Sequence, residues 1–278
     1  MGANKQGDIR ELVHIAQPTH GLITNIGKAH LEGFGGLEGV RKGKGELFDY
    51  LNASGGVTFL PQQAGAVTEM FQERRMNNAV YVNEALPTTL VEAKPMVRFS
   101  LASGEVIDTH LPGIYNFENI QLAIAVGKFF QLSDEQCTTG ISTYIPNNHR
   151  SQFIKIGSNQ VLMDAYNANP SSMSAAISHF AATDGEPKLL ILGDMFELGK
   201  ESEKEHFDLI SFCIRNKFEN IFLIGLEFFK HKNNFDVPFF YKTKKELINH
   251  FQKNPITSKH ILIKGSRGMK MEELTNYI

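Results

Sequence analysis

The feature that most constrains the fold is a regular alternation in the second half of the chain. Four continuous apolar runs, each closing on Asp or Gly, are separated by stretches with helical spacing: VLMD, LLILG, NIFLIG and HILIKG. A strand that is apolar along its whole length is buried on both faces, which is typical of a parallel sheet covered by helices. The pattern predicts a Rossmann-like α/β unit.

The first half is predicted to be a second α/β unit with a β-rich insertion. A short strand-like run at Leu22–Ile26 precedes a glycine-rich loop and a helix near Leu37–Leu51. From Val57 to Leu111 short β-branched runs alternate with turn residues, and Ala102–Gly104 is typical of a hairpin turn. Helical spacing returns over Asn116–Phe130.

The boundary between the two units is expected near Ile145–Asn148. Pro146 stops the preceding helix, and the two following asparagines favour a turn. We therefore expect domains at residues 1–148 and 149–278, each long enough to bury its own core.

Composition excludes several classes of protein. No run approaches the roughly 18 apolar residues of a membrane span, and Met1–Arg10 is too polar for a signal peptide. The net charge is −2 with Lys and Arg scattered, so we expect no nucleic-acid partner. Cys137 and Cys213 are expected to be buried, reduced thiols of a cytoplasmic protein.

Polar clusters follow three of the apolar runs. They are Asp164–Met173 (DAYNANPSSM), Leu192–Gly199 (LGDMFELG) and Lys264–Arg267 (KGSR). Ligands of open α/β sheets bind at the carboxyl ends of the strands, so these segments are candidates for substrate contact. Helix capping is the alternative for the first of them, which leads into a helix through Pro170.

Three further candidates lie in the first half. His30 stands in the glycine-rich phrase NIGKAHLEGFG, where it could face a crevice or act as an ordinary loop hydrogen-bonder. Lys42 and Lys44 lie among glycines. They are candidates for a functional site, but the arrangement is equally typical of a solvated helix start. Asn116 and Asn119 are three residues apart near a predicted helix start, which suits the edge of an adenine or, alternatively, an N-cap plus an exposed amide.

Taken together, these phrases resemble the Mur ligase family of ATP-dependent amide-forming enzymes. The resemblance runs from Met1, whose MGAN matches a family segment, to Met271. It implies an incomplete central ATPase-like α/β domain followed by a Rossmann-like C-terminal domain, with ATP and Mg²⁺ as cofactors. The implied substrates are UDP-N-acetylmuramoyl-tripeptide, activated as an acyl phosphate, and D-alanyl-D-alanine, in cytoplasmic peptidoglycan synthesis.

The resemblance also assigns roles to residues. His30 and a CO₂-carbamylated Lys44 would bind magnesium, and with Arg150, which would contact the ATP phosphates, they form the implied catalytic set. Asn116 and Asn119 would contact adenine, and Asp164 would bind ribose. The residues implied to face substrate are Tyr166, Asn167, Asn169, Asp194, Glu197, Lys264, Ser266 and Arg267.

One part of the family pattern is absent from these 278 residues. Gly39–Gly45 lacks the spacing and the Ser or Thr of a phosphate-binding loop, and no GxxxxGK[ST] occurs elsewhere. We therefore expect this polypeptide alone to be an inactive fragment of a ligase. A non-catalytic module that binds nucleotide or wall precursor, and another amide ligase of the same superfamily, are the alternatives.

Overall fold

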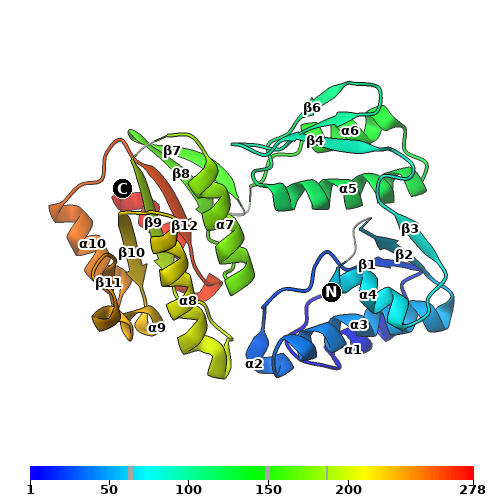
Figure 1. The fold of residues 1–278 in the computed structure, drawn as a ribbon, viewed down its shortest axis with the longest axis horizontal. Coiled ribbons are helices and arrows are strands. Elements are labelled where there is room, and N and C mark those ends of the chain that lie inside the picture. Colours follow the sequence, from blue (N-terminus) through cyan, green and yellow to red (C-terminus); the bar gives the residue numbers. More distant parts are fainter. Residues whose placement is uncertain (62–64, 148–150, 186) are drawn as a thin grey trace. The chain divides into compact units, whose positions relative to one another are not determined.

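The computed structural model describes residues 1–61, 65–147, 151–185 and 187–278. The chain forms two compact units, Met1–Ile145 and Pro146–Ile278, each with sheets and helices of its own (Figure 1).

The first unit is built on a parallel sheet of three short strands. These are, in order across the sheet, β1 (His20–Leu22), β2 (Val57–Leu60) and β3 (Ala79–Tyr81). Its first four helices are α1 (Asp8–Ala16), α2 (Leu31–Phe34), α3 (Leu37–Ser54) and α4 (Ala66–Glu73). Phe48 and Leu51 of α3 pack with Leu60 and Met70 in the core between helices and sheet.

The predicted strand at Leu22–Ile26 is misplaced. Strand β1 pairs with β2 only from His20 to Leu22, and the chain then leaves the sheet. The carbonyl of Asn25 accepts a hydrogen bond from the side chain of Lys44 instead of continuing the ladder. The apolar residues Ile23 and Ile26 still pack on the core, which explains why the run looked like strand.

The β-rich insertion is confirmed as an antiparallel sheet. Its strands are β4 (Thr88–Glu92), β5 (Arg98–Leu101) and β6 (Val106–Asp108). Gly104, at φ 88°, closes the hairpin between β5 and β6, as its sequence predicts. Phe99 and Ile107 of this sheet pack against α5 (Ile114–Phe129) and α6 (Asp134–Ser142).

The second unit contains a six-stranded sheet in the order β11-β10-β9-β12-β8-β7. The four predicted runs are all strands: β8 (Asn159–Asp164), β9 (Lys188–Gly193), β10 (Asn220–Ile224) and β12 (His260–Lys264). They run parallel to one another and to β11 (Phe239–Tyr241). Only β7 (Gln152–Ile156) is antiparallel, as the hairpin partner of β8.

Helices cover both faces of this sheet, as the doubly apolar strands require. On one face Leu247 and Phe251 of α10 (Lys244–Lys253) pack with Met271 and Leu274 of the C-terminal 3₁₀ segment η4 (Met271–Tyr277). Helices α7 (Pro170–Ala182) and α8 (Ser202–Arg215) lie on the other face (Figure 1). Because β9, β12 and β8 are parallel neighbours in the sheet, their carboxyl ends lie side by side at one edge.

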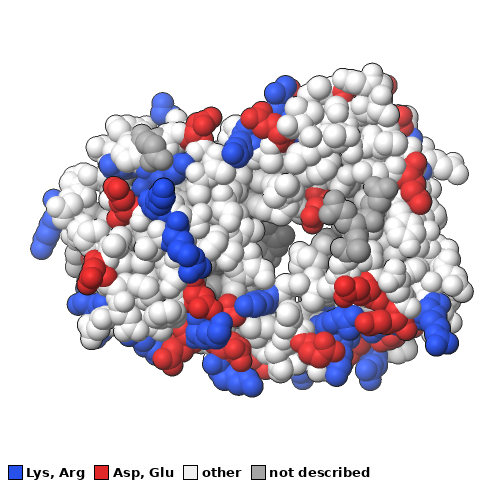
Figure 2. All heavy atoms as spheres, viewed as in Figure 1, with Lys and Arg blue, Asp and Glu red and all other residues white. Residues whose placement is uncertain are grey.

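The surface carries both signs of charge. On the face drawn in Figure 2, Lys and Arg side chains are interspersed with Asp and Glu. Among the described residues no helix is both long and apolar enough to span a bilayer.

Candidate functional site

His30 stands at the entrance of the short helix α2. Its backbone is left-handed at φ 54°, a conformation that is uncommon for a residue with a Cβ. Its carbonyl accepts the amide of Phe34, so His30 is the N-terminal flanking residue of that helix. The side chain is half-buried in the loop that follows β1.

Lys44 lies well inside α3, which begins at Leu37, and not at a solvated helix start. Its half-buried side chain reaches back to the loop after β1, where Nζ donates to the carbonyl of Asn25 over 2.8 Å. Desolvation by the surrounding protein lowers the pKa of the Lys44 amine, so its neutral form is more accessible than that of a surface lysine.

The glycines around Lys44 serve helix packing. A Cβ on Gly39 would lie 1.8 Å from the carbonyl oxygen of Phe34, and one on Gly43 would lie 2.3 Å from the Phe34 ring. Because α2 packs this closely on α3, neither position has room for a side chain. The glycine spacing therefore needs no phosphate to explain it.

Asn116 and Asn119 meet in the first turns of α5, as their spacing predicts. The Nδ2 of Asn119 donates to the Oδ1 of Asn116 over 3.3 Å, and the Nδ2 of Asn116 donates to the Pro112 carbonyl over 2.7 Å. The residue that precedes the helix is Gly113, so Asn116 is not its N-cap.

Few protein groups in the described part of the chain are arranged to bind a magnesium ion. No group of three or more His, Cys, Asp and Glu side chains suited to a metal occurs among residues 1–61, 65–147, 151–185 and 187–278. His30 and a carbamate on Lys44 would together supply one nitrogen and hard oxygens. Magnesium keeps several waters and binds substrate phosphates, so a small protein contribution fits its chemistry, although these residues do not complete a site.

A buried polar cluster of the second unit joins the ends of β8 and β12. The Nζ of Lys264, a residue only 2% exposed, lies 2.5 Å from Oδ2 of Asp164 and 3.0 Å from the carbonyl oxygen of Asn167. The other oxygen of Asp164 accepts the amide of Ser151 over 2.9 Å. Residues that lie 13 and 100 positions away in the sequence thus converge on the carboxylate of Asp164.

In the turn after β8, some residues make local hydrogen bonds that shape the backbone, and others are exposed to solvent. Asn169 is the N-cap of α7, where its side chain accepts the amide of Ser172 over 2.9 Å. Asn167 folds its amide oxygen back onto the Ala168 amide over 2.8 Å. Tyr166 is 44% exposed at this edge, which suits contact with a substrate.

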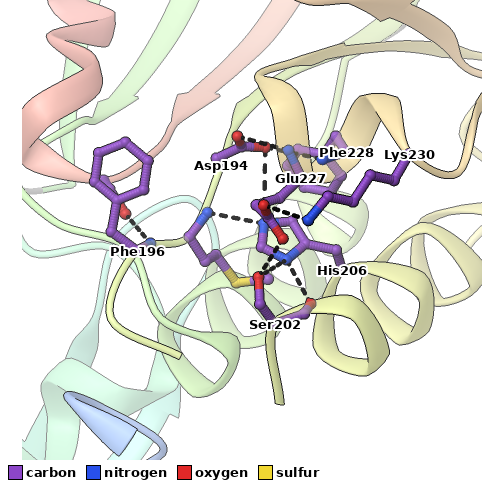
Figure 3. A network of polar contacts seen from close by, with 9 residues as sticks. Asp194, Phe196, Ser202, His206, Glu227, Phe228 and Lys230 are labelled. Atoms are coloured by element: carbon purple, nitrogen blue, oxygen red, sulfur yellow. Dashed lines mark hydrogen bonds and ion pairs between the residues drawn. The ribbon is translucent and has the colours of Figure 1, made fainter. Parts of the chain in front are cut away.

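Asp194 is 3% exposed and points into the protein. Its two carboxylate oxygens accept the amides of Glu227 and Phe228, each over 3.0 Å, at the start of α9 (Leu226–Phe229) (Figure 3). Burial raises the pKa of Asp194, partly offset by these two amide bonds. Its neighbours Phe196 and Glu197 are exposed.

The remaining predicted residues follow β12 or lie outside the described residues. Ser266 is 3% exposed, and its Oγ accepts the amide of Phe196 over 2.8 Å. Arg267 is exposed and pairs with Glu272, with Nη1 and Oε1 2.6 Å apart. Arg150 lies outside the described residues.

Sequence reasoning missed His206, a fully buried residue of α8 that contacts the loop after β9. A signal was present: His206 precedes Leu209, Ile210 and Cys213 at helical spacing, so it lies on the buried stripe of its helix. A histidine in such a stripe needs partners for both ring nitrogens.

The chain belongs to the Mur ligase family. Residues 1–127 match the Mur ligase middle domain, and residues 149–267 match the Mur ligase glutamate ligase domain. Its similar relatives are named UDP-N-acetylmuramoyl-tripeptide–D-alanyl-D-alanine ligase. Those of Bacillus subtilis and Escherichia coli are each 30% identical over 99% of this chain, which covers 62% and 63% of their lengths.

Solved structures agree with this assignment. A crystal structure of MurF from Acinetobacter baumannii matches 99% of this chain and 63% of its own, at 29% identity and a TM-score of 0.86. The MurF ligase of Thermotoga maritima in complex with ADP shares the fold at 19% identity and a TM-score of 0.80. The chain thus spans about 62% of the length of the curated relatives that it matches.

Proposed function

We propose that this chain supplies the nucleotide- and substrate-binding core of a cytoplasmic, ATP-dependent ligase that joins D-alanyl-D-alanine to UDP-N-acetylmuramoyl-tripeptide. The observation that carries the proposal is the cluster at the carboxyl edge of the second sheet. There Lys264 bonds both Asp164 and Asn167, so that two motif phrases meet in one buried polar site. The names of the relatives supply the substrates.

The reaction has two steps. A carboxylate oxygen of the tripeptide attacks the γ-phosphorus of ATP, an acyl phosphate forms and ADP leaves. The amine of D-alanyl-D-alanine then attacks the acyl carbon, phosphate leaves, and the new amide sheds a proton. Negative charge accumulates in both steps, so fixed cationic donors at the reacting centre lower the barrier.

Among the described residues of the second unit, we assign Lys264 as a cation that serves this purpose. Its ammonium is held by Asp164 and by the carbonyl oxygen of Asn167, so its positive charge is fixed at this edge of the sheet. Asp164 keeps its proposed ribose role, because a carboxylate offers about four lone-pair sites and can accept further hydrogen bonds. Exposed Tyr166, Glu197 and Arg267 are proposed to reach substrate.

In the first unit, we assign magnesium binding to His30 and to Lys44 as a carbamate, and adenine contact to Asn116 and Asn119. Only a neutral amine adds to CO₂, and burial of Lys44 favours that form. Magnesium, when bound, would neutralise charge on the phosphates. Arg150 remains proposed as a contact to the ATP phosphates.

The test uses the reading frame that contains these residues. Phosphate release is measured with ATP, UDP-N-acetylmuramoyl-tripeptide and D-alanyl-D-alanine, and with L-alanyl-L-alanine as the control dipeptide. We expect release only with the D-isomer, and none from the 278-residue chain alone. Equal rates with both dipeptides, or no release from the whole reading frame, would reject the proposal.

Lys44→Ala tests the carbamate role in the same assay. We expect at least about a hundredfold loss of rate, since a preorganised electrostatic group is removed, with partial recovery when short carboxylates are added. Lys42→Ala, one residue before Gly43 and exposed, is the matched control. A Lys44→Ala enzyme with near-normal activity would contradict the role.

A further inference from the structure

The backbone after β9 is held by an unusual set of partners. Three consecutive amides each donate to a different element. They are Asp194 to the carbonyl of Ile224 in β10 at 3.0 Å, Met195 to Nε2 of His206 in α8 at 3.0 Å, and Phe196 to Oγ of Ser266 after β12 at 2.8 Å. We call this set the amide clamp. Two of its acceptors are backbone or hydroxyl oxygens, and the third is an imidazole nitrogen.

The hydrogen bonds of His206 define its protonation state. Nδ1 lies 2.7 Å from the carbonyl oxygen of Ser202, which can only accept, so Nδ1 carries the proton. Nε2 receives the Met195 amide and must offer a lone pair. The geometry therefore requires the neutral imidazole with its proton on Nδ1. The ring of Phe228 packs edge-on against it, with the two ring centroids 4.6 Å apart.

The clamp fixes the direction in which the chain leaves the sheet. Met195 is 1% exposed, so without His206 its amide would be buried with no acceptor, at a cost of roughly 1–3 kcal/mol. Directly after it, Phe196 and Glu197 are exposed, and the ring of Phe196 points away from the His206 network (Figure 3). The buried imidazole of His206 thus fixes the backbone that carries the exposed side chains of Phe196 and Glu197.

We propose that His206 is a positioning residue for the ligase reaction: its neutral imidazole, by accepting the Met195 amide, holds Phe196 and Glu197 in place at the substrate-binding edge. The inference rests on the proposed function, since it takes this edge as the place where substrate binds. It goes beyond that function because His206 itself touches no substrate.

Protonation of His206 would turn Nε2 into a donor facing another donor. The ionisable groups that face the ring are Asp194, whose Oδ1 is 3.8 Å from Nε2, Glu227 of α9, and His231 after α9. Lys230 forms an ion pair with Glu227, with Nζ and Oε1 2.6 Å apart. Burial lowers the pKa of His206 and so keeps the clamp intact near neutral pH.

Two substitutions separate the clamp from simple packing. In His206→Gln the side-chain oxygen can take the place of Nε2 and accept the Met195 amide. In His206→Asn the amide can take the place of Nδ1 and reach Ser202, but nothing accepts from Met195. In the active ligase we expect His206→Asn to raise KM for D-alanyl-D-alanine about threefold to tenfold, the worth of one hydrogen bond, while His206→Gln stays close to the parent.

A structural readout on the 278-residue chain keeps the inference separate from the ligase activity. Nitrogen-15 NMR should find Nδ1 of His206 protonated and Nε2 bare. Hydrogen exchange of the Met195 amide should be slow in the parent and in His206→Gln, and faster in His206→Asn. A protonated Nε2 at neutral pH, or equal losses in KM and exchange for both variants, would overturn the positioning role. A slow-exchanging Met195 amide, combined with no phosphate release from the whole reading frame, would instead reject the proposed function and leave the hydrogen bond to His206 intact.

Discussion

The ion pair between Lys264 and Asp164 allows a quantitative prediction about stability. The Lys264 side chain is 3% exposed and that of Asp164 is 14% exposed, with Nζ and Oδ2 2.5 Å apart. Lys264→Met keeps most of the buried volume and removes the charge. Among the described residues, the amide and hydroxyl of Ser151 then remain as donors to the carboxylate. Breaking a buried pair from one side costs about 3–5 kcal/mol. Because Asp164 keeps some water contact and these two donors, we expect about 3 kcal/mol.

The double variant decides whether the cost is electrostatic. Asp164→Asn with Lys264→Met removes both charges, and replacing a buried pair by neutral groups is often close to neutral in stability. We expect the double variant to recover about 2 kcal/mol relative to Lys264→Met alone, a coupling typical of contacting residues. Asp164→Asn alone should cost less than Lys264→Met, since the amide oxygen and the Asn167 carbonyl can still accept from the ammonium.

Native-state hydrogen exchange is the suitable assay, because the chain has two compact units and a single unfolding transition is not assured. The free energy of opening is measured at the amides of β8 and β12, which pair along their lengths. A loss below about 1 kcal/mol for Lys264→Met, or a double variant no more stable than Lys264→Met, would refute the argument that this pair is a mutually dependent buried site.

Three further predictions concern single residues. Asn169→Ala should lower the unfolding free energy by about 1 kcal/mol through loss of the α7 cap, whereas Asn169→Ser should not, as measured by denaturant unfolding. Burial raises the pKa of Cys213 to about 12, and that of Cys137 is raised too, so a thiol reagent should label neither until the chain unfolds. The pKa of His206 is lowered in the folded chain, so the unfolded chain takes up the proton first and stability is lost as pH falls below about 6.5. His206→Gln should lose less stability than the parent between neutral pH and pH 5, and an unchanged difference between the two would contradict this.

The second sheet could be predicted from the sequence because its strands are apolar on both faces. A short, continuously apolar run such as LLILG is typical of a parallel strand covered on both faces, so its length and composition are enough to predict the strand. The first sheet was harder. Strand β1 pairs with β2 over only three residues. The apolar Ile23 and Ile26 beyond it pack in the core without pairing in the sheet. Helices α1 and α4 and strand β4 went unpredicted for a similar reason: all three are short.

Strand order explains what the sequence could not reveal about the site. The motif phrases follow β8, β9 and β12 in the chain, but β12 lies between the other two in the sheet. Its end therefore serves both neighbours: Lys264 bonds Asp164 on the β8 side, and Ser266 bonds the Phe196 amide on the β9 side. Spacing along the chain places all three phrases at one edge, yet only the insertion of the last strand between the first two makes them a single network. A change that shifts the end of β12 should thus disturb the ion pair and the amide clamp together, even though Asp164 and Asp194 are about 30 residues apart in sequence.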